Sequence, residues 1–158
     1  MTTIELGIES NQSAFAALKT DGTVVAWGDS SKGGTAPAGL CFVKSIYSNA
    51  WAFAALKTDG TVVAWGDSRY GGSVPSGLSG VKAIASSNQA FAALKTDGTV
   101  QAWGRSSSDG GSAPANLSNV KTIFSNTTSF VALKNDDTAV AWGGMTGGEA
   151  VITQQQRH

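Results

Sequence analysis

Side chains that commonly carry out catalysis or hold metal ions are scarce in this chain of 158 residues. It has one cysteine, Cys41, and one histidine, His158. A Ser/His/Asp or Cys/His relay needs a histidine beside the nucleophile, and a structural zinc site needs several cysteine or histidine ligands. A single cysteine also excludes a disulfide within one chain. We therefore expect a protein that is not an enzyme, and we assign no catalytic, cofactor-binding or metal-binding residue.

Carboxylates follow two Trp-Gly pairs, as Asp29 and Asp67, and Arg105 holds the corresponding place after a third pair. Paired carboxylates could serve a glycosidase, and clustered carboxylates could hold a metal ion. An aspartate in this position is more typical of a turn, in which the side chain accepts hydrogen bonds from its own backbone. Because these residues recur with an internal period of the chain, we interpret them as turn residues.

The chain consists of four similar sequence units, and the Trp-Gly pairs mark their period. The tryptophans of these pairs are Trp27, Trp65, Trp103 and Trp142, at spacings of 38, 38 and 39 residues. A phenylalanine lies twelve residues before each of them. The units span approximately 5–42, 43–80, 81–119 and 120–158, and we predict one domain over 1–158.

Each unit is expected to form three short β-strands, with room for a fourth in the loop rich in Gly, Ser and Pro that follows. In the second unit the strands are 43–47, 53–57 and 61–65. Asp-Gly between the last two predicts a hairpin with a type I′ turn, and Asp136-Asp137 predicts a looser hairpin in the fourth unit. The runs FAAL and VVAW are apolar on both faces, which is typical of sheets covered on both sides. We therefore predict an all-β fold, a β-propeller of three to four strands per blade.

The pattern A-L-K-x-D-G-x-V-x-A-W-G-D, followed by a Gly-rich loop, resembles the regulator-of-chromosome-condensation (RCC1-like) repeat. With V-x-A-I before it and Val74-Pro75 after it, the pattern is similar to a short-bladed subgroup, typified by a bacterial β-lactamase inhibitor that forms a propeller. The resemblance covers essentially the whole chain. It implies a β-propeller that binds protein and a bacterial source.

The number of blades per ring stays open at this point. Propellers of this family with blades of this length usually close with about seven blades. Either four blades close on themselves, or two chains pair head to tail and share one eight-bladed ring. Four blades that stay open would leave apolar faces and edges unpaired. Because four narrow blades must splay strongly to close, we favour the homodimer.

Positions that vary between the nearly identical units are the candidate partner-binding residues. They lie in the loop between the first two strands and in the loop after each Trp-Gly pair, which a β-meander places at one end of the blade. The resemblance implies that Trp51 and Tyr70 correspond to aromatics that contact a bound enzyme, although Trp51 could equally pack within its loop. The predicted loop face comprises Gln12, Lys32, Asn49, Trp51, Arg69, Tyr70, Gln89, Arg105 and Asn126.

Composition narrows the class of partner. The chain has 11 basic and 11 acidic residues and 14% charged residues, which disfavours nucleic acid because that partner needs a basic surface. We expect no membrane partner, since no apolar run approaches the roughly 18 residues that span a bilayer. The start has no secretory signal, which favours a cytoplasmic location, with signal-independent export as the alternative.

We predict a non-catalytic binding module for a protein partner. The alternatives are a self-assembling structural unit and a lectin-like glycan binder with one polar site per blade.

Overall fold

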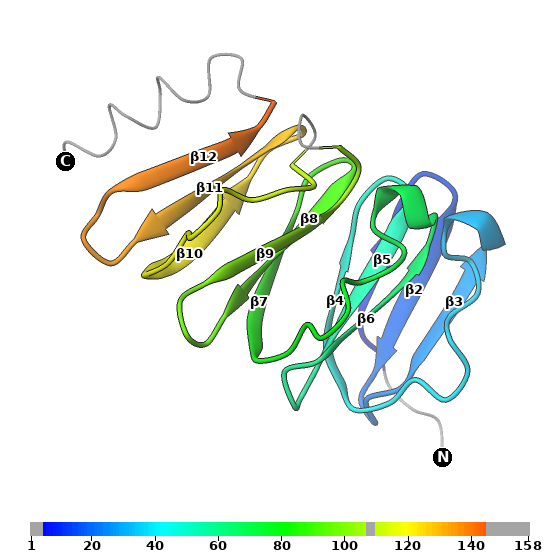
Figure 1. Ribbon diagram of the computed structural model, residues 1–158. Coiled ribbons are helices and arrows are strands. Elements are labelled where there is room, and N and C mark those ends of the chain that lie inside the picture. Colours follow the sequence, from blue (N-terminus) through cyan, green and yellow to red (C-terminus); the bar gives the residue numbers. More distant parts are fainter. Residues whose placement is uncertain (1–4, 107–109, 145–158) are drawn as a thin grey trace.

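The computed structural model describes residues 5–106 and 110–144, which form four antiparallel three-stranded sheets (Figure 1). Strands pair in chain order within each sheet, and we call the sheets blades 1 to 4. The strands are β1 (Glu5–Ser10), β2 (Ala14–Lys19) and β3 (Val24–Gly28); β4 (Val43–Ser48), β5 (Ala52–Lys57) and β6 (Val62–Gly66); β7 (Val81–Ser86), β8 (Ala90–Lys95) and β9 (Val100–Gly104); and β10 (Val120–Ser125), β11 (Ser129–Lys134) and β12 (Ala139–Gly143). The predicted all-β, four-bladed propeller architecture is confirmed.

The hairpin between the second and third strands of a blade differs from the predicted type I′ turn. In blade 1 the N–H of Gly22 donates to the carbonyl oxygen of Lys19 at 3.0 Å, and the N–H of Lys19 donates to Thr23 at 3.0 Å. Gly22 has a φ of 82°, whereas Asp21 does not have a positive φ. This is a three-residue loop, a type I turn followed by one left-handed residue.

The corresponding hairpin of blade 4 is not looser, so that prediction was wrong. Asp137 takes the left-handed position with a φ of 69°. The two backbone hydrogen bonds of this loop measure 2.8 and 2.9 Å, as short as those of the Asp-Gly hairpins. Aspartate is among the few residues that tolerate a positive φ, which explains why the loop keeps its form.

The loop after the third strand begins with a short 3-10 helix in blades 1 and 2, η1 (Ser30–Lys32) and η2 (Ser68–Tyr70). The side chain of Asp29 accepts a hydrogen bond from the N–H of Ser31 at 2.9 Å, and Asp67 accepts one from the N–H of Arg69 at 3.0 Å. Both aspartates therefore cap a turn, which confirms their interpretation as turn residues. Within the described residues each blade has three strands and no fourth.

Neighbouring blades pack face to face through their middle strands. On β5, Ala52 and Ala54 belong to the cluster shared with blade 3, while Phe53 and Ala55 belong to the cluster shared with blade 1. All four side chains are fully buried. The sheet is thus covered on both faces, as the apolar runs predicted, and the small alanines let the sheets approach closely.

In blades 1 to 3, a Gly-Gly pair in the loop after the third strand packs against the next blade. A Cβ added at Gly33 of blade 1 would lie 2.5 Å from Cδ2 of Phe53 in blade 2, so the backbone itself lies on the ring. The indole N–H of Trp65 donates to the carbonyl oxygen of Gly33 at 3.0 Å. The same hydrogen bond joins the next two pairs of blades, from Trp103 to Gly71 at 3.1 Å and from Trp142 to Gly110 at 3.3 Å.

The blades stand side by side in chain order, with blades 1 and 4 at opposite ends of the row (Figure 1). The first strands β4, β7 and β10 each contact the first two strands of the preceding blade. Among the described residues there is no helix long and apolar enough to cross a membrane.

Candidate functional site

The two variable loops of a blade meet at one end of it, as the meander predicted. In blade 1 the side-chain amide of Asn11, in the first loop, donates to the carbonyl oxygen of Lys32, in the second loop, at 2.7 Å. In blade 2 Asn49 donates in the same way to Tyr70 at 2.6 Å. The hairpin turns lie at the other end of the strands. The variable positions therefore share one face, which we call the loop face.

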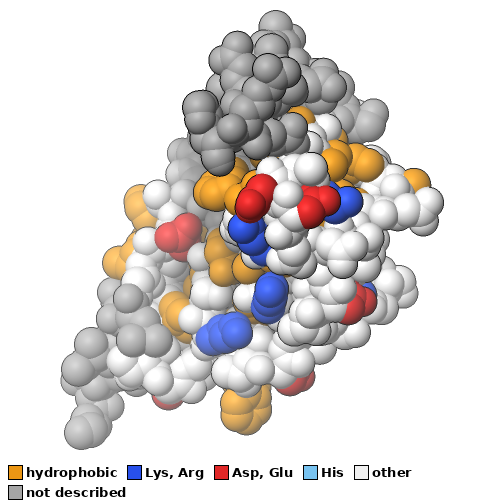
Figure 2. Space-filling model, turned by 90° about the vertical axis from the view of Figure 1, so that its left-hand side faces the viewer, with side chains coloured by type: hydrophobic (Ala, Val, Ile, Leu, Met, Phe, Trp, Pro, Cys, Tyr) orange, Lys and Arg blue, Asp and Glu red, His pale blue; other side chains and the backbone are white. Residues whose placement is uncertain are grey.

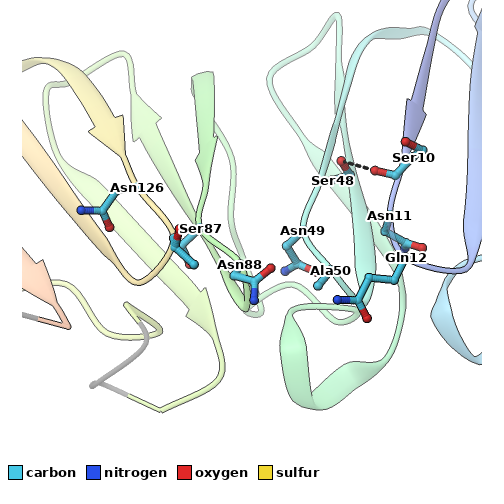
Figure 3. Close-up of a pocket in the computed structure, with 10 residues that line it drawn as sticks. Ser10, Asn11, Gln12, Ser48, Asn49, Ala50, Ser87, Asn88 and Asn126 are labelled. Atoms are coloured by element: carbon cyan, nitrogen blue, oxygen red, sulfur yellow. Dashed lines mark hydrogen bonds between the residues drawn. The ribbon is translucent and has the colours of Figure 1, made fainter.

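A hollow of about 450 Å³ opens on the loop face between the first loops of the four blades (Figure 3). All of the residues that line it are uncharged, and each blade contributes at least one side-chain amide: Gln12, Asn49, Asn88 and Asn126 among them. Amides both donate and accept hydrogen bonds, and although Asn49 and Asn126 already bond to their own loops, the uncharged polar lining suits a polar, uncharged group.

Backbone hydrogen bonds tie these first loops to one another. The N–H of Ala50 in blade 2 donates to the carbonyl oxygen of Asn88 in blade 3 at 3.0 Å, and the N–H of Asn88 donates to Thr127 in blade 4 at 2.8 Å. Three loops from separate units are thereby held in a fixed relation. The loop face is consequently a supported surface and not a set of independent loops.

Trp51 and Tyr70 form an aromatic stack on blade 2. Their ring centroids are 5.1 Å apart and their planes are inclined by 24°. Trp51 lies in the first loop and Tyr70 in the second, and both are half-buried. The indole N–H of Trp51 is buried without a hydrogen-bond partner in the described part of the chain, whereas the indoles of Trp65, Trp103 and Trp142 all donate to glycine carbonyls.

Three cations from three different blades surround this stack. The Lys32 ammonium lies 4.9 Å from the centroid of the Trp51 ring, and the guanidinium groups of Arg69 and Arg105 lie 5.4 and 5.5 Å from that of Tyr70. Such cation–π contacts are worth roughly 0.5–1 kcal/mol at exposed sites, which orders the long side chains. We call Lys32, Trp51, Arg69, Tyr70 and Arg105 the aromatic–cation cluster.

Two aspartates pair with cations of the cluster and are ionised at neutral pH. Asp67 accepts from Arg69 Nη2 at 2.7 Å, and the side-chain hydrogen bond from Arg69 is the largest cause of the lowered pKa of Asp67. Asp29 lies 3.7 Å from the Lys32 ammonium, and the Ser31 hydroxyl is the largest cause of the lowered pKa of Asp29.

The third blade reverses the charge at the equivalent position. Arg105 stands where blades 1 and 2 have aspartate, and its Nη1 donates to Oε1 of Gln89 at 3.0 Å. Counted with Asp29 and Asp67, the cluster therefore has three cations and two anions, a net positive charge in a chain whose formal net charge is zero.

The predicted site residues lie in two regions of the loop face, the aromatic–cation cluster and the hollow. Lys32, Trp51, Arg69, Tyr70, Arg105 and Gln89 belong to the cluster or contact it, and Gln12, Asn49 and Asn126 line the hollow. Asn49 is only 6% exposed, and its Oδ1 accepts from the N–H of Trp51 at 2.9 Å. Asn126 likewise accepts from the N–H groups of Thr128 and Ser129, so both asparagines shape their loops.

Asn88 and Thr127 also line the hollow; both belong to the variable first loops predicted from the sequence, although neither is among the nine residues of the predicted loop face. They occupy the same position of the repeat as Gln12 and Ala50, and the variation at this position is the sequence signal that points to them. Parts of the second loops of the third and fourth units, at 107–109 and 145–146, lie outside the described residues. Within the part that is described, no three His, Cys, Asp or Glu residues gather closely enough to hold a metal ion.

Comparisons with known proteins agree with the repeat and the fold. Residues 43–71 match the family model of the regulator of chromosome condensation (RCC1) repeat. The structure resembles Prp20p from Saccharomyces cerevisiae, with a TM-score of 0.67 and 18% identity over 90% of this chain and 46% of that one. It also resembles the ectodomain of the receptor kinase CR4 from Physcomitrella patens, with a TM-score of 0.66 and 19% identity over 89% of this chain and 40% of that one.

A third similar structure is the computationally designed protein Ika4, with a TM-score of 0.53 and 17% identity over 90% of this chain and 92% of that one. No curated protein matches the chain in sequence. The chain spans less than half the length of Prp20p and of CR4. At these identities the likeness establishes a shared RCC1-like propeller fold.

Proposed function

We propose that the chain is a non-catalytic binding module that presents its loop face to a protein partner. The observation that carries this proposal is the stacked pair Trp51 and Tyr70, flanked by three cations that three separate blades supply. Tryptophan, tyrosine and arginine are the residue types that most often anchor protein interfaces. Prp20p, which shares the fold, is described with binding properties toward Gsp1p and histones, and this supports a protein partner here.

The placement of the cluster within the repeat supports the same proposal. The scaffold residues recur in every unit, whereas Trp51 replaces Ser13, Gln89 and Thr128 of the other units. Burial of the repeated core does not require an aromatic at this position. The unpaired indole N–H of Trp51 offers a donor to a partner that shifts the loop slightly, and the positive charge of the cluster favours an acidic segment.

The hollow favours a second candidate, a glycan. Uncharged amides and hydroxyls from four blades converge there, and sugars are recognised by such groups. This geometry predicts one shared glycan site per chain and not one site per blade.

Three narrower expectations stay predictions from the sequence. They are the resemblance to the β-lactamase-inhibitor subgroup, a bacterial source and a cytoplasmic location.

The experiment pans a phage-displayed library of random peptides against the immobilised full chain. We expect enrichment of acidic peptides whose binding weakens as salt concentration rises. The double variant Trp51→Ala, Tyr70→Ala should lose this binding, because truncating two anchors typically costs about 2 kcal/mol or more each. A matched control is Phe42→Asn, which removes an aromatic that is 66% exposed at the opposite end of the blades.

The alternatives give different results in the same assay. Peptide binding that survives the double variant contradicts the loop-face assignment, provided circular dichroism shows both proteins folded. Binding of a single-stranded oligonucleotide at the cluster, with no peptide enriched, contradicts a protein partner. A glycan array positive for wild type and negative for Asn88→Ala would instead support the second candidate.

A further inference from the structure

The three junctions between successive blades have the same contact, in which a glycine of one blade covers a Phe–Trp pair of the next. In blade 2 the covered pair is Phe53 and Trp65, stacked at 5.5 Å and 0% and 6% exposed. Blades 3 and 4 repeat the arrangement with pairs that are equally buried: Phe91 with Trp103, and Phe130 with Trp142. The pair is therefore the receiving half of a junction between blades.

Blade 1 carries the same receiving half, but it is not covered. Phe15 and Trp27 stack at 5.4 Å with an inclination of 18°, which reproduces the geometry of the internal pairs. They are nevertheless 44% and 43% exposed. Ile8 is 51% exposed, whereas its counterpart Ile46 in blade 2 is 9% exposed. The face is thus already formed in the shape that accepts a preceding blade. We call it the leading face.

Blade 4 presents the complementary half at the other end of the row. Val131 and Leu133 on β11 are only half-buried, although their counterparts Ala54 and Leu56 on β5 are fully buried against blade 3. Phe124 on β10 is 57% exposed. Figure 2 views the molecule from this side and shows hydrophobic side chains on it. We call this the trailing face.

We propose that the leading face of blade 1 is a docking site for the trailing face of blade 4 of a second copy of this chain. The leading face is the receiving half of a junction that already forms three times within the chain, and the described part of blade 4 offers an exposed sheet face that corresponds to the covering half. Such a head-to-tail contact closes a ring when the rotation permits it, and two copies would make two junctions and eight blades.

Two further observations favour a copy of this chain as the occupant. The leading face reproduces the Phe–Trp stack that a preceding blade covers at each of the three internal junctions, and the trailing face of blade 4 is built from the same repeat as those covering blades. The described blades also superpose on less than half of Prp20p and of CR4, so this fold readily continues beyond four blades. The docking site lies at the end of the row and does not depend on the proposed function of the loop face.

Sedimentation equilibrium of the full chain at micromolar concentration tests the proposal. We expect twice the chain mass of 16.0 kDa. The variant Trp27→Lys should raise the dimer dissociation constant about a hundredfold or more, because it removes a central aromatic anchor. It should keep the far-ultraviolet circular dichroism of the wild type, since Trp27 is half exposed in the single chain. The control Phe42→Asn changes an aromatic that is even more exposed, 66% against 43% for Trp27, and lies outside both faces, so it should remain dimeric.

The variant Phe124→Lys tests the trailing face, where Phe124 is 57% exposed, and leaves the leading face intact. It should also give a folded monomer, and it decides the matter if Trp27→Lys fails to fold. A wild-type chain that is a folded monomer overturns the proposal, as does a dimer that survives both substitutions. Assemblies that keep growing with concentration overturn the closed ring of two.

Discussion

Substituting Gly71 by alanine tests the physical basis of the junction between blades. A Cβ at this position would lie 2.7 Å from Cδ2 and 3.0 Å from Cε2 of Phe91, and the residue has a φ of +101°. Gly77, in the same loop, is the matched control. Its φ is +78°, but an added Cβ would have no neighbour within 4 Å. Both substitutions strain the backbone, and only Gly71→Ala also forces the blades apart.

The difference between the two variants isolates the contact with Phe91. Placing alanine in the left-handed region costs roughly 1–2 kcal/mol, which is the whole effect expected for Gly77→Ala. Overpacking a tight core contact adds roughly 1–3 kcal/mol, so Gly71→Ala should cost about 2–5 kcal/mol. Domains of this size have a free energy of unfolding of roughly 5–15 kcal/mol, and Gly71→Ala should lose a large part of it.

Urea denaturation followed by tryptophan fluorescence measures this difference. The two variants and the wild type must be compared at one protein concentration, because self-association would make the midpoint depend on concentration. An unchanged m-value shows that the midpoint reports stability alone. Equal losses for Gly71→Ala and Gly77→Ala would refute the reasoning, because the ring of Phe91 would then not need a bare backbone against it.

Two further predictions concern backbone strain and acid stability. Phe42 has a φ of 57° and occupies the position where the later units have Gly80 and Asn119. Because asparagine tolerates this conformation better than phenylalanine, Phe42→Asn should raise the free energy of unfolding by about 1 kcal/mol in the same denaturation assay. An unchanged or lower midpoint would contradict the strain at Phe42. The side-chain and backbone hydrogen bonds of Thr61 lower the pKa of Asp59 below its ordinary value of 3.8. Ionised Asp59 therefore stabilises the fold above pH 3.8, and this stabilisation is lost as the pH falls through the lowered pKa. The denaturation midpoint of Asp59→Asn should therefore fall less steeply than that of wild type below pH 4, and parallel curves would exclude this contribution.

Much of the fold could be predicted from the sequence because the same local pattern occurs in all four units. The run FAAL predicted a strand buried on both faces, and Phe53 and Ala54 are buried against opposite neighbours. The turn type could not be predicted, since Asp-Gly is compatible with several hairpin loops. The register of the flanking strands selects the three-residue form, with its single left-handed residue at Gly22.

The sequence predicted which residues share the loop face, but not the contacts between them. Variation between units selected Trp51, Tyr70 and Lys32, and the meander placed their loops together. That Lys32 of blade 1 lies over the ring of Trp51 in blade 2 depends on how blades are rotated against each other, which no single unit encodes. The hollow depends on the same rotation, because its wall comes from four separate units.

The sequence by itself determined the period, the strands, the apolar faces and the loops that vary, because each depends on residues close together in the chain. Only the tertiary structure decided which Phe–Trp pairs are covered. Phe15 and Trp27 have the same local sequence as Phe53 and Trp65, yet they differ in exposure by about 40 percentage points. Burial in a repeat protein is supplied by the neighbouring unit. The first blade therefore exposes what the following blades hide, and its exposed pair is the surface that we expect a second copy to cover.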